Sequence, residues 1–143
     1  CGRLASGEPS PARYRSDLAG LVSLGAGLAP DGEQALVGVA AAARRLAAWQ
    51  LVPEASLSAF SSAIADPSLP GVPEPARRAL DDASRGGYPG PLAAFVELVG
   101  VADAEDGAVK EAAHRLVAGG TRPGADSLAG VVALVREIAL GLP

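Results

Sequence analysis

Two observations predict that this chain of 143 residues folds as a single all-α domain. Apolar residues recur at the i, i+3, i+4 and i+7 spacing of a helix that buries one stripe, and no segment has the pattern of a strand. Hydrophobic residues make up 49% of the chain and aromatic residues only 3%, so the apolar side chains are mainly those of Ala, Leu and Val. Such small side chains allow helices to pack closely.

About seven helices are expected, and several of them have a recognisable start. The apolar stripes that define them cover residues 18–28, 36–47, 57–64, 76–83, 92–99, 109–117 and 128–142. Asp31 is placed to cap the second helix, with Gln34 as its capping-box partner. Pro75 suits a first helical turn, and the last helix is expected to start from a cap on Asp126 or Ser127.

The helices also show an internal similarity, because related five-residue segments open every second helix. These segments are Leu18-Ala-Gly-Leu-Val, Leu57-Ser-Ala-Phe-Ser, Leu92-Ala-Ala-Phe-Val and Leu128-Ala-Gly-Val-Val, at offsets of 39, 35 and 36 residues. Repeats of this length are typical of stacked antiparallel helical hairpins. We therefore expect either an α-solenoid-like array, with alternate helices in two layers, or an irregular helical bundle.

The turn of the third hairpin resembles that of a HEAT repeat. Leu98-Val99 leads into an acidic turn, Ala102-Asp103-Ala104-Glu105-Asp106, which is followed by Val109-Lys110-Glu111-Ala112-Ala113. The resemblance covers residues 54–120 and implies a HEAT-like α-solenoid that binds protein, with the second helix of each hairpin on the concave surface. The Pro-rich insertion over 67–75 and the first hairpin depart from the family's pattern.

Five basic residues are candidates for contacting a partner. When the hairpins are aligned, Arg44, Arg78 and His114 take equivalent positions, and Arg45 and Arg115 lie beside two of them. Such a row would dock an acidic partner or a phosphorylated segment, because Arg presents a planar fork to carboxylate or phosphate.

The alternative is that these residues belong to a solvated face with local ion pairs. Arg78 would then pair with Asp81 or Asp82 on its own helix, and Arg115 would pair with Glu111 one turn earlier. Both interpretations are compatible with the sequence.

Composition argues against several other functions. A formal net charge of −4 lacks the basic footprint of a nucleic-acid-binding protein. The longest nearly apolar stretch, residues 18–30, is shorter than the roughly 20 residues of a transmembrane helix. His114 is the only histidine, so no metal site, His-based catalytic triad or cofactor is expected. Trp49 and Phe95 are expected to anchor the core, and Tyr88 to lie at a helix edge.

Residues 1–14 are expected to form a flexible tether ahead of a helical domain over 15–143. Cys1 is the only cysteine and there is no Met, so an upstream segment is expected to have been removed. A terminal Cys before a polar stretch resembles the start of a mature bacterial lipoprotein, which implies a lipid on Cys1 and a place in the cell envelope. The alternative is an excerpt of a longer chain that happens to begin with Cys, in which case a cytoplasmic location is expected.

The sequence therefore predicts a non-enzymatic helical protein-protein interaction module, with membrane contact only through a lipid on Cys1. The alternative is a helical bundle that binds a small apolar ligand or a lipid in an interior pocket.

Overall fold

A computed structural model describes residues 31–69, 71–99, 101, 103–118 and 122–141. Over these residues the chain forms six helices and no strand, so the all-α prediction is confirmed. The helices are α2 (Asp31–Ala48), α3 (Glu54–Ile64), α4 (Glu74–Ser84), α5 (Gly90–Leu98), α6 (Asp106–Val117) and α7 (Arg122–Gly141). The predicted tether and the helix expected over 18–28 lie outside the described residues.

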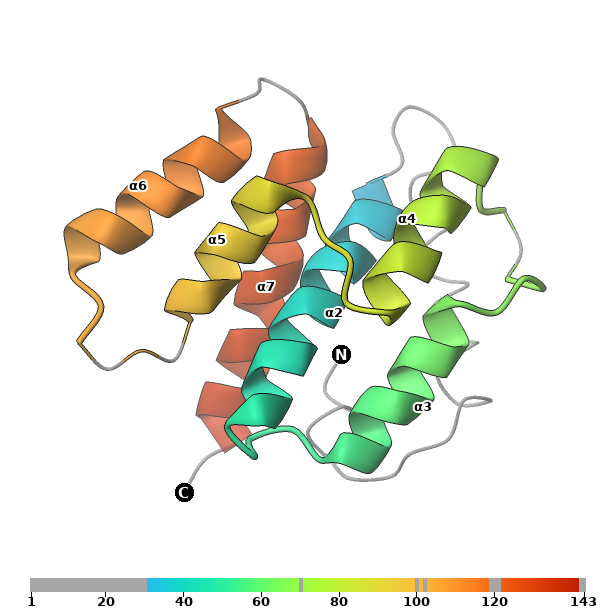
Figure 1. Ribbon diagram of the computed structural model, residues 1–143, viewed down its shortest axis with the longest axis horizontal. Coiled ribbons are helices and arrows are strands. Elements are labelled where there is room, and N and C mark those ends of the chain that lie inside the picture. The colour runs from blue at the N-terminus through green and yellow to red at the C-terminus, as the bar shows by residue number, and fades with distance from the viewer. Residues whose placement is uncertain (1–30, 70, 100, 102, 119–121, 142–143) are drawn as a thin grey trace.

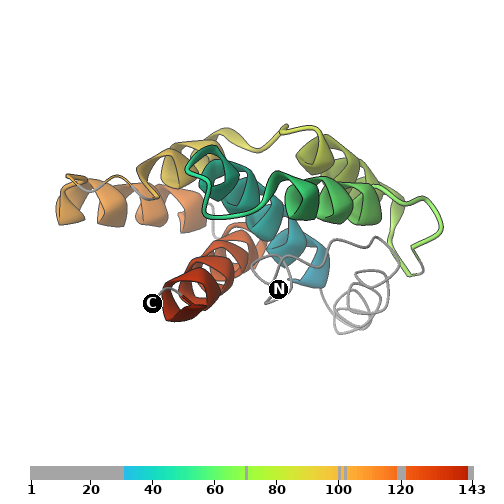
Figure 2. The same cartoon turned by 90° about the horizontal axis from the view of Figure 1, so that it is seen from below.

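The bundle is organised around α2. This helix packs against α3, α4, α5 and α7, whereas α6 packs on α5 and α7. In Figure 1, α3 and α4 lie on one side of α2 and α5 and α6 on the other. The view turned by 90° places α7 below this layer (Figure 2).

This arrangement differs from a regular two-layer array of hairpins. In such an array α2 and α7 would belong to different layers and to opposite ends, yet they form the most extensive helix pair among the described elements. The α-solenoid-like arrangement and the count of seven helices are therefore not confirmed, and the described residues form a helical bundle.

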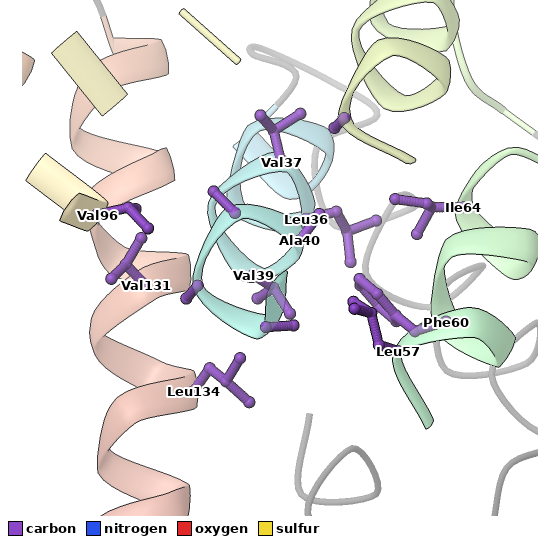
Figure 3. Packing of buried hydrophobic residues seen from close by; sticks show 14 of the residues in the cluster. Leu36, Val37, Val39, Ala40, Leu57, Phe60, Ile64, Val96, Val131 and Leu134 are labelled. Carbon is purple, nitrogen blue, oxygen red and sulfur yellow. The ribbon is translucent and has the colours of Figure 1, made fainter. Parts of the chain in front are cut away.

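The central position of α2 follows from its composition. From Leu36 to Ala43 its apolar residues are at most 2% exposed, on all sides of the helix. A helix that is apolar around its circumference is stable only when other elements cover it on every side. Figure 3 shows these elements supplying Leu57, Phe60 and Ile64 from α3, Val96 from α5, and Val131 and Leu134 from α7.

The α2–α7 crossing is unusually close, because a glycine lies on each helix at the contact. A Cβ on Gly38 would lie 2.0 Å from the carbonyl oxygen of Ser127, and one on Gly130 would lie 2.0 Å from that of Ala35. The hydroxyl of Ser127 donates a hydrogen bond to the Gln34 carbonyl oxygen across the same contact, at 3.1 Å.

The α2–α7 contact also explains why the start predicted for α7, at Asp126 or Ser127, was wrong. The helix begins at Arg122, so Asp126 and Ser127 lie inside its first two turns and not at its cap. Ser127 is 4% exposed because its side chain faces α2. The start of α4 agrees better with the sequence, since Pro75 lies in its first turn as predicted.

The Pro-rich connection between α3 and α4 is held by Arg77, a residue that the sequence analysis did not single out. Its guanidinium donates to the carbonyl oxygens of Pro67 at 2.8 Å and Leu69 at 3.2 Å. The Leu69 side chain is buried in the hydrophobic core. One side chain thus satisfies backbone acceptors that a proline-rich turn leaves without helical partners.

Adding a methyl group at the α2–α7 crossing should destabilise the protein. Gly38→Ala or Gly130→Ala would place a Cβ 2.0 Å from a backbone oxygen. The helices would have to move apart, so we expect the free energy of unfolding to fall by about 1–3 kcal/mol. Urea unfolding followed by circular dichroism measures this change.

Gly107→Ala, in the first turn of α6, is the matched control, since a Cβ there meets no atom within 4 Å. It should be neutral or stabilise the protein by up to about 1 kcal/mol, because Ala is the better helix former. Equal stability of the Gly38→Ala and Gly107→Ala proteins would contradict a close crossing.

Candidate functional site

A groove of about 360 Å³ lies between the C-terminal half of α2, the turn after α4, and α5. Its apolar walls are Ala41, Ala48, Ala93 and Val96. Its polar lining consists of Arg44, Arg45, Tyr88 and Glu97. We call it the Arg44–Arg45 groove, because two of the five basic residues predicted from the sequence line it.

Arg44 is oriented by the end of α4 and by the turn that follows. Its Nη2 donates to the carbonyl oxygen of Ser84, the last residue of α4, at 2.8 Å. Its Nε donates to the hydroxyl oxygen of Tyr88 at 3.2 Å. A cation at a helix C-terminus satisfies a carbonyl that has no helical partner and interacts favourably with the helix dipole. Gly86, at φ 88°, lets the backbone turn beside this guanidinium, since a Cβ would lie 3.3 Å from Nε.

Arg45 makes the corresponding contact with α5. Its Nη2 donates to the carbonyl oxygen of Glu97 at 2.9 Å, and its Nη1 lies 3.4 Å from the Glu97 carboxylate. Its guanidinium carbon lies 5.6 Å from the centre of the Trp49 ring, within the range of a cation–π contact. Its Nε is buried and finds no acceptor among the described residues.

Trp49 is exposed, which contradicts the prediction that it anchors the core. The chain leaves α2 through a turn in which Gln50 has a φ of 59° and the Leu51 amide donates to the Leu46 carbonyl at 3.0 Å. This geometry is that of a Schellman motif. It directs Trp49 and Leu51 outward, where they are 50% and 40% exposed. Phe95, the other predicted anchor, is buried at 7% exposure.

Tyr88 links the Arg44 side chain in the groove to the backbone of α2. Its hydroxyl donates to the Ala40 carbonyl oxygen at 3.4 Å while it accepts the Nε hydrogen of Arg44. Burial disfavours the phenolate and raises the pKa of Tyr88 above its usual value of 10.0, although the nearby Arg44 charge acts in the opposite direction. Tyr88 is therefore a neutral structural partner of Arg44 at physiological pH.

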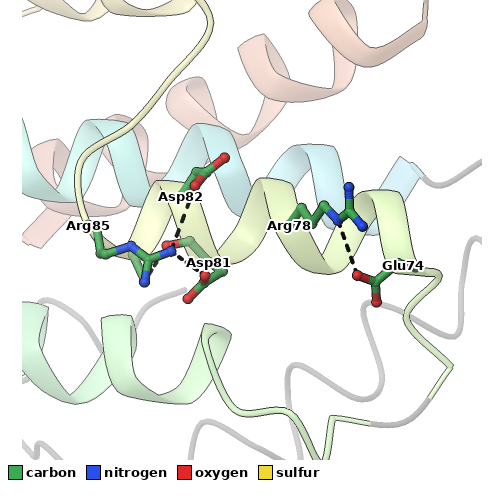
Figure 4. Close-up of polar contacts among 6 residues, drawn as sticks. Glu74, Arg78, Asp81, Asp82 and Arg85 are labelled. Atoms are coloured by element: carbon green, nitrogen blue, oxygen red, sulfur yellow. Dashed lines mark hydrogen bonds and ion pairs between the residues drawn. The ribbon is translucent and has the colours of Figure 1, made fainter.

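The other three predicted basic residues lie away from this groove. Arg78 is exposed on α4 and pairs with Glu74 at 3.1 Å, one turn earlier in the helix. Arg85, which follows the last residue of α4, pairs with Asp81 and Asp82, the two residues that the sequence had suggested for Arg78 (Figure 4).

On α6 the prediction of local pairing fits the structure. Arg115 lies 3.1 Å from Glu111, one turn earlier, and both side chains are exposed. His114 is exposed beside them. Exposed pairs of this kind contribute about 0.3–0.5 kcal/mol each on a helix, so they are weak evidence for a site. Arg44 and Arg45 thus line one groove, whereas Arg78, His114 and Arg115 lie on other elements.

The described residues contain no group of three or more His, Cys, Asp or Glu side chains arranged to hold a metal ion. None of the helices described is both long enough and apolar enough to cross a membrane.

Comparison with known proteins finds no matching family model, no matching curated protein and no matching solved structure. The HEAT-like and lipoprotein-like features therefore stay predictions from the sequence.

The ionisation of Tyr88 tests the geometry of the groove. The chain has two tyrosines, so in a Tyr14→Phe protein the absorbance change of phenolate formation reports Tyr88 alone. We expect a midpoint above the usual value of about 10, because burial opposes the charged form. A raised pKa of this acid also means that folding stability falls as pH rises above about 10, where the unfolded chain loses its proton first.

In the Tyr88→Phe protein this alkaline loss of stability should be smaller. A Tyr88 midpoint at or below 10 would contradict the buried position of the phenol.

Proposed function

We propose that this protein is a non-enzymatic protein-protein interaction module that binds an acidic segment of a partner at the Arg44–Arg45 groove. The observation that carries the proposal is the combination, at one place, of an exposed Trp49 and two arginines beside a groove. Trp, Tyr and Arg are the residues most enriched at the energetic centres of protein interfaces.

The charges of the groove favour an acidic partner. Among the described residues that line the groove, Arg44 and Arg45 are basic and Glu97 alone is acidic, so the lining carries a local positive excess on a chain whose net charge is −4. An Arg side chain has five N–H donors, and the contacts described above for Arg44 use two of them. A partner carboxylate would accept from the remaining donors in a charge-assisted hydrogen bond.

The walls of the groove and Trp49 supply the apolar part of the interface. Ala41, Ala48, Ala93 and Val96 leave a hollow that an apolar side chain next to the carboxylate would fill. Trp49 is oriented by the Arg45 guanidinium, which is in turn bound to Glu97. A side chain that is held in place before binding loses little conformational entropy when a partner covers it.

The HEAT-like turn between α5 and α6 adds sequence support for a protein-binding role. The alternative function, a bundle that holds a small apolar ligand, calls for an enclosed interior cavity. The Arg44–Arg45 groove is open to solvent and lined by charged groups, so it suits a protein segment better than a lipid.

Truncating Trp49 should weaken the interaction without unfolding the protein. The partner segment would first be identified by placing a photo-reactive benzoylphenylalanine at position 51, next to Trp49, and cross-linking in the cells that produce the protein. For that segment we expect Trp49→Ala to cost about 2 kcal/mol of binding free energy, a loss of roughly thirtyfold in affinity. Isothermal titration calorimetry measures the affinity.

Arg78→Ala is the control, because Arg78 is exposed on α4 and pairs only within that helix among the described residues. It should leave the affinity unchanged. A cross-linked segment without acidic residues, or equal affinities of the Trp49→Ala and wild-type proteins, would refute the proposal.

We also propose that Cys1 carries the lipid that its resemblance to lipoproteins implies, although residue 1 lies outside the described residues. Two acyl signals together would give stable anchoring, whereas one chain binds a membrane only marginally. Intact-mass measurement of the protein from its native membrane fraction tests this. An unmodified Cys1, or a chain that continues upstream of it, would remove the anchor.

A further inference from the structure

The acidic residue that lines the Arg44–Arg45 groove, Glu97, contacts Arg45 in two different ways. Its backbone carbonyl oxygen accepts a hydrogen bond from Nη2 of Arg45 at 2.9 Å. Its carboxylate lies 3.4 Å from Nη1, which is longer than a charge-assisted hydrogen bond, so this second contact is an ion pair. The backbone oxygen is fixed by helix α5, whereas the carboxylate is carried on a side chain that is 73% exposed.

The Arg45 guanidinium is held in place without the help of that carboxylate. The backbone oxygen of Glu97 binds its Nη2, and its central carbon lies 5.6 Å from the centre of the Trp49 ring. An ion pair with an exposed carboxylate adds little stability, because water screens the charges and the long side chains lose conformational freedom. The Glu97 carboxylate can therefore move away into water while Arg45 keeps its position.

The donors of Arg45 that remain for a partner lie beside the Glu97 carboxylate. A guanidinium has five N–H donors, one on Nε and two on each of the terminal nitrogens. The Arg45 Nε is buried, so its hydrogen does not reach a partner in solution. One hydrogen of Nη2 is bound to the backbone of α5. An incoming carboxylate therefore has to bind at the terminal nitrogens, where the Glu97 carboxylate already lies close to Nη1.

Trp49 determines that a partner meets this end of Arg45. The arginine whose guanidinium lies over the Trp49 ring is Arg45, so a segment that covers the exposed ring comes against that guanidinium. Arg44, in contrast, is held between the Ser84 carbonyl and the Tyr88 hydroxyl, on the side of α4. Two carboxylates at one guanidinium repel each other at a distance of a few ångströms. One of them has to leave.

We propose that Glu97 is an internal competitor of the partner: its carboxylate occupies Arg45 in the free protein and is displaced when an acidic side chain of the partner binds. This inference rests on the proposed function and adds how the groove selects its ligand. The groove favours a segment whose contacts with Trp49 outweigh the lost ion pair over a small acid that offers a carboxylate alone. Glu97 is thus a specificity-determining residue of the groove.

Glu97→Gln tests the competition, because it removes the charge but keeps the size of the side chain and the backbone carbonyl that holds Arg45. The probes are an end-blocked pentapeptide of alternating leucine and glutamate and a twin with glutamine in place of glutamate. Each is titrated into the isotopically labelled full-length chain, and amide and arginine Nε–H chemical shifts report the site and the affinity. We expect the acidic peptide to bind the Glu97→Gln protein at least about threefold more tightly than the wild type. The glutamine twin should not distinguish the two proteins.

Glu74→Gln is the matched control, since Glu74 also forms an exposed ion pair with an arginine, Arg78, but at the start of α4 and outside the groove lining. It should leave the affinity for the acidic peptide unchanged.

Three results would overturn the competition and leave the proposed function in place. These are equal or weaker binding of the acidic peptide by the Glu97→Gln protein, an equal gain in the Glu74→Gln protein, or an equal gain for the glutamine twin. Failure of the acidic peptide to bind either the wild-type or the Glu97→Gln protein would instead contradict the acidic ligand itself, and both proposals with it.

Discussion

The close approach of α2 and α7 is the constraint on which the rest of the structure depends. Two backbones come within contact distance because Gly38 and Gly130 present no Cβ to the carbonyl groups opposite them. This approach covers one side of a helix that is apolar all round, and α3, α4 and α5 cover the remainder. Without α7, the buried side chains of α2 would face water, and each large one would lose about 1.5–3 kcal/mol of transfer free energy.

The C-terminal half of the central helix α2 also supplies two side chains to the Arg44–Arg45 groove. Successive residues of a helix point about 100° apart, so Arg44 reaches the end of α4 while Arg45 reaches the end of α5. The same two side chains that join these helices to α2 also line the groove. The groove is therefore oriented by the bundle itself, which is the preorganisation that the proposed docking function needs.

The helical period predicted most elements, because apolar spacing and proline positions report local structure directly. Arg44 and Arg45 were singled out from the sequence as part of an aligned row with Arg78 and His114, and the structure places only the first two at the groove. Their role in binding a partner stays a prediction. Trp49 was assigned to the core because large aromatic residues are usually buried, and no local signal shows that Gln50 takes a positive φ and turns the ring outward. The start of α7 was missed because Ser127 has the chemistry of a cap but donates its hydrogen bond to α2. The α2–α7 contact itself joins residues 93 positions apart, a separation that no periodic pattern reveals.

Native-state hydrogen exchange tests most directly whether the α2–α7 pair holds the bundle together. If it does, the amides of residues 36–43 in α2 and 127–138 in α7 exchange only through global unfolding, with equal free energies. The amides of α6, which buries one residue, then exchange through a local opening of lower free energy. Exchange of α2 or α7 at a lower free energy than α6 would contradict this account, because the central pair would open before the periphery.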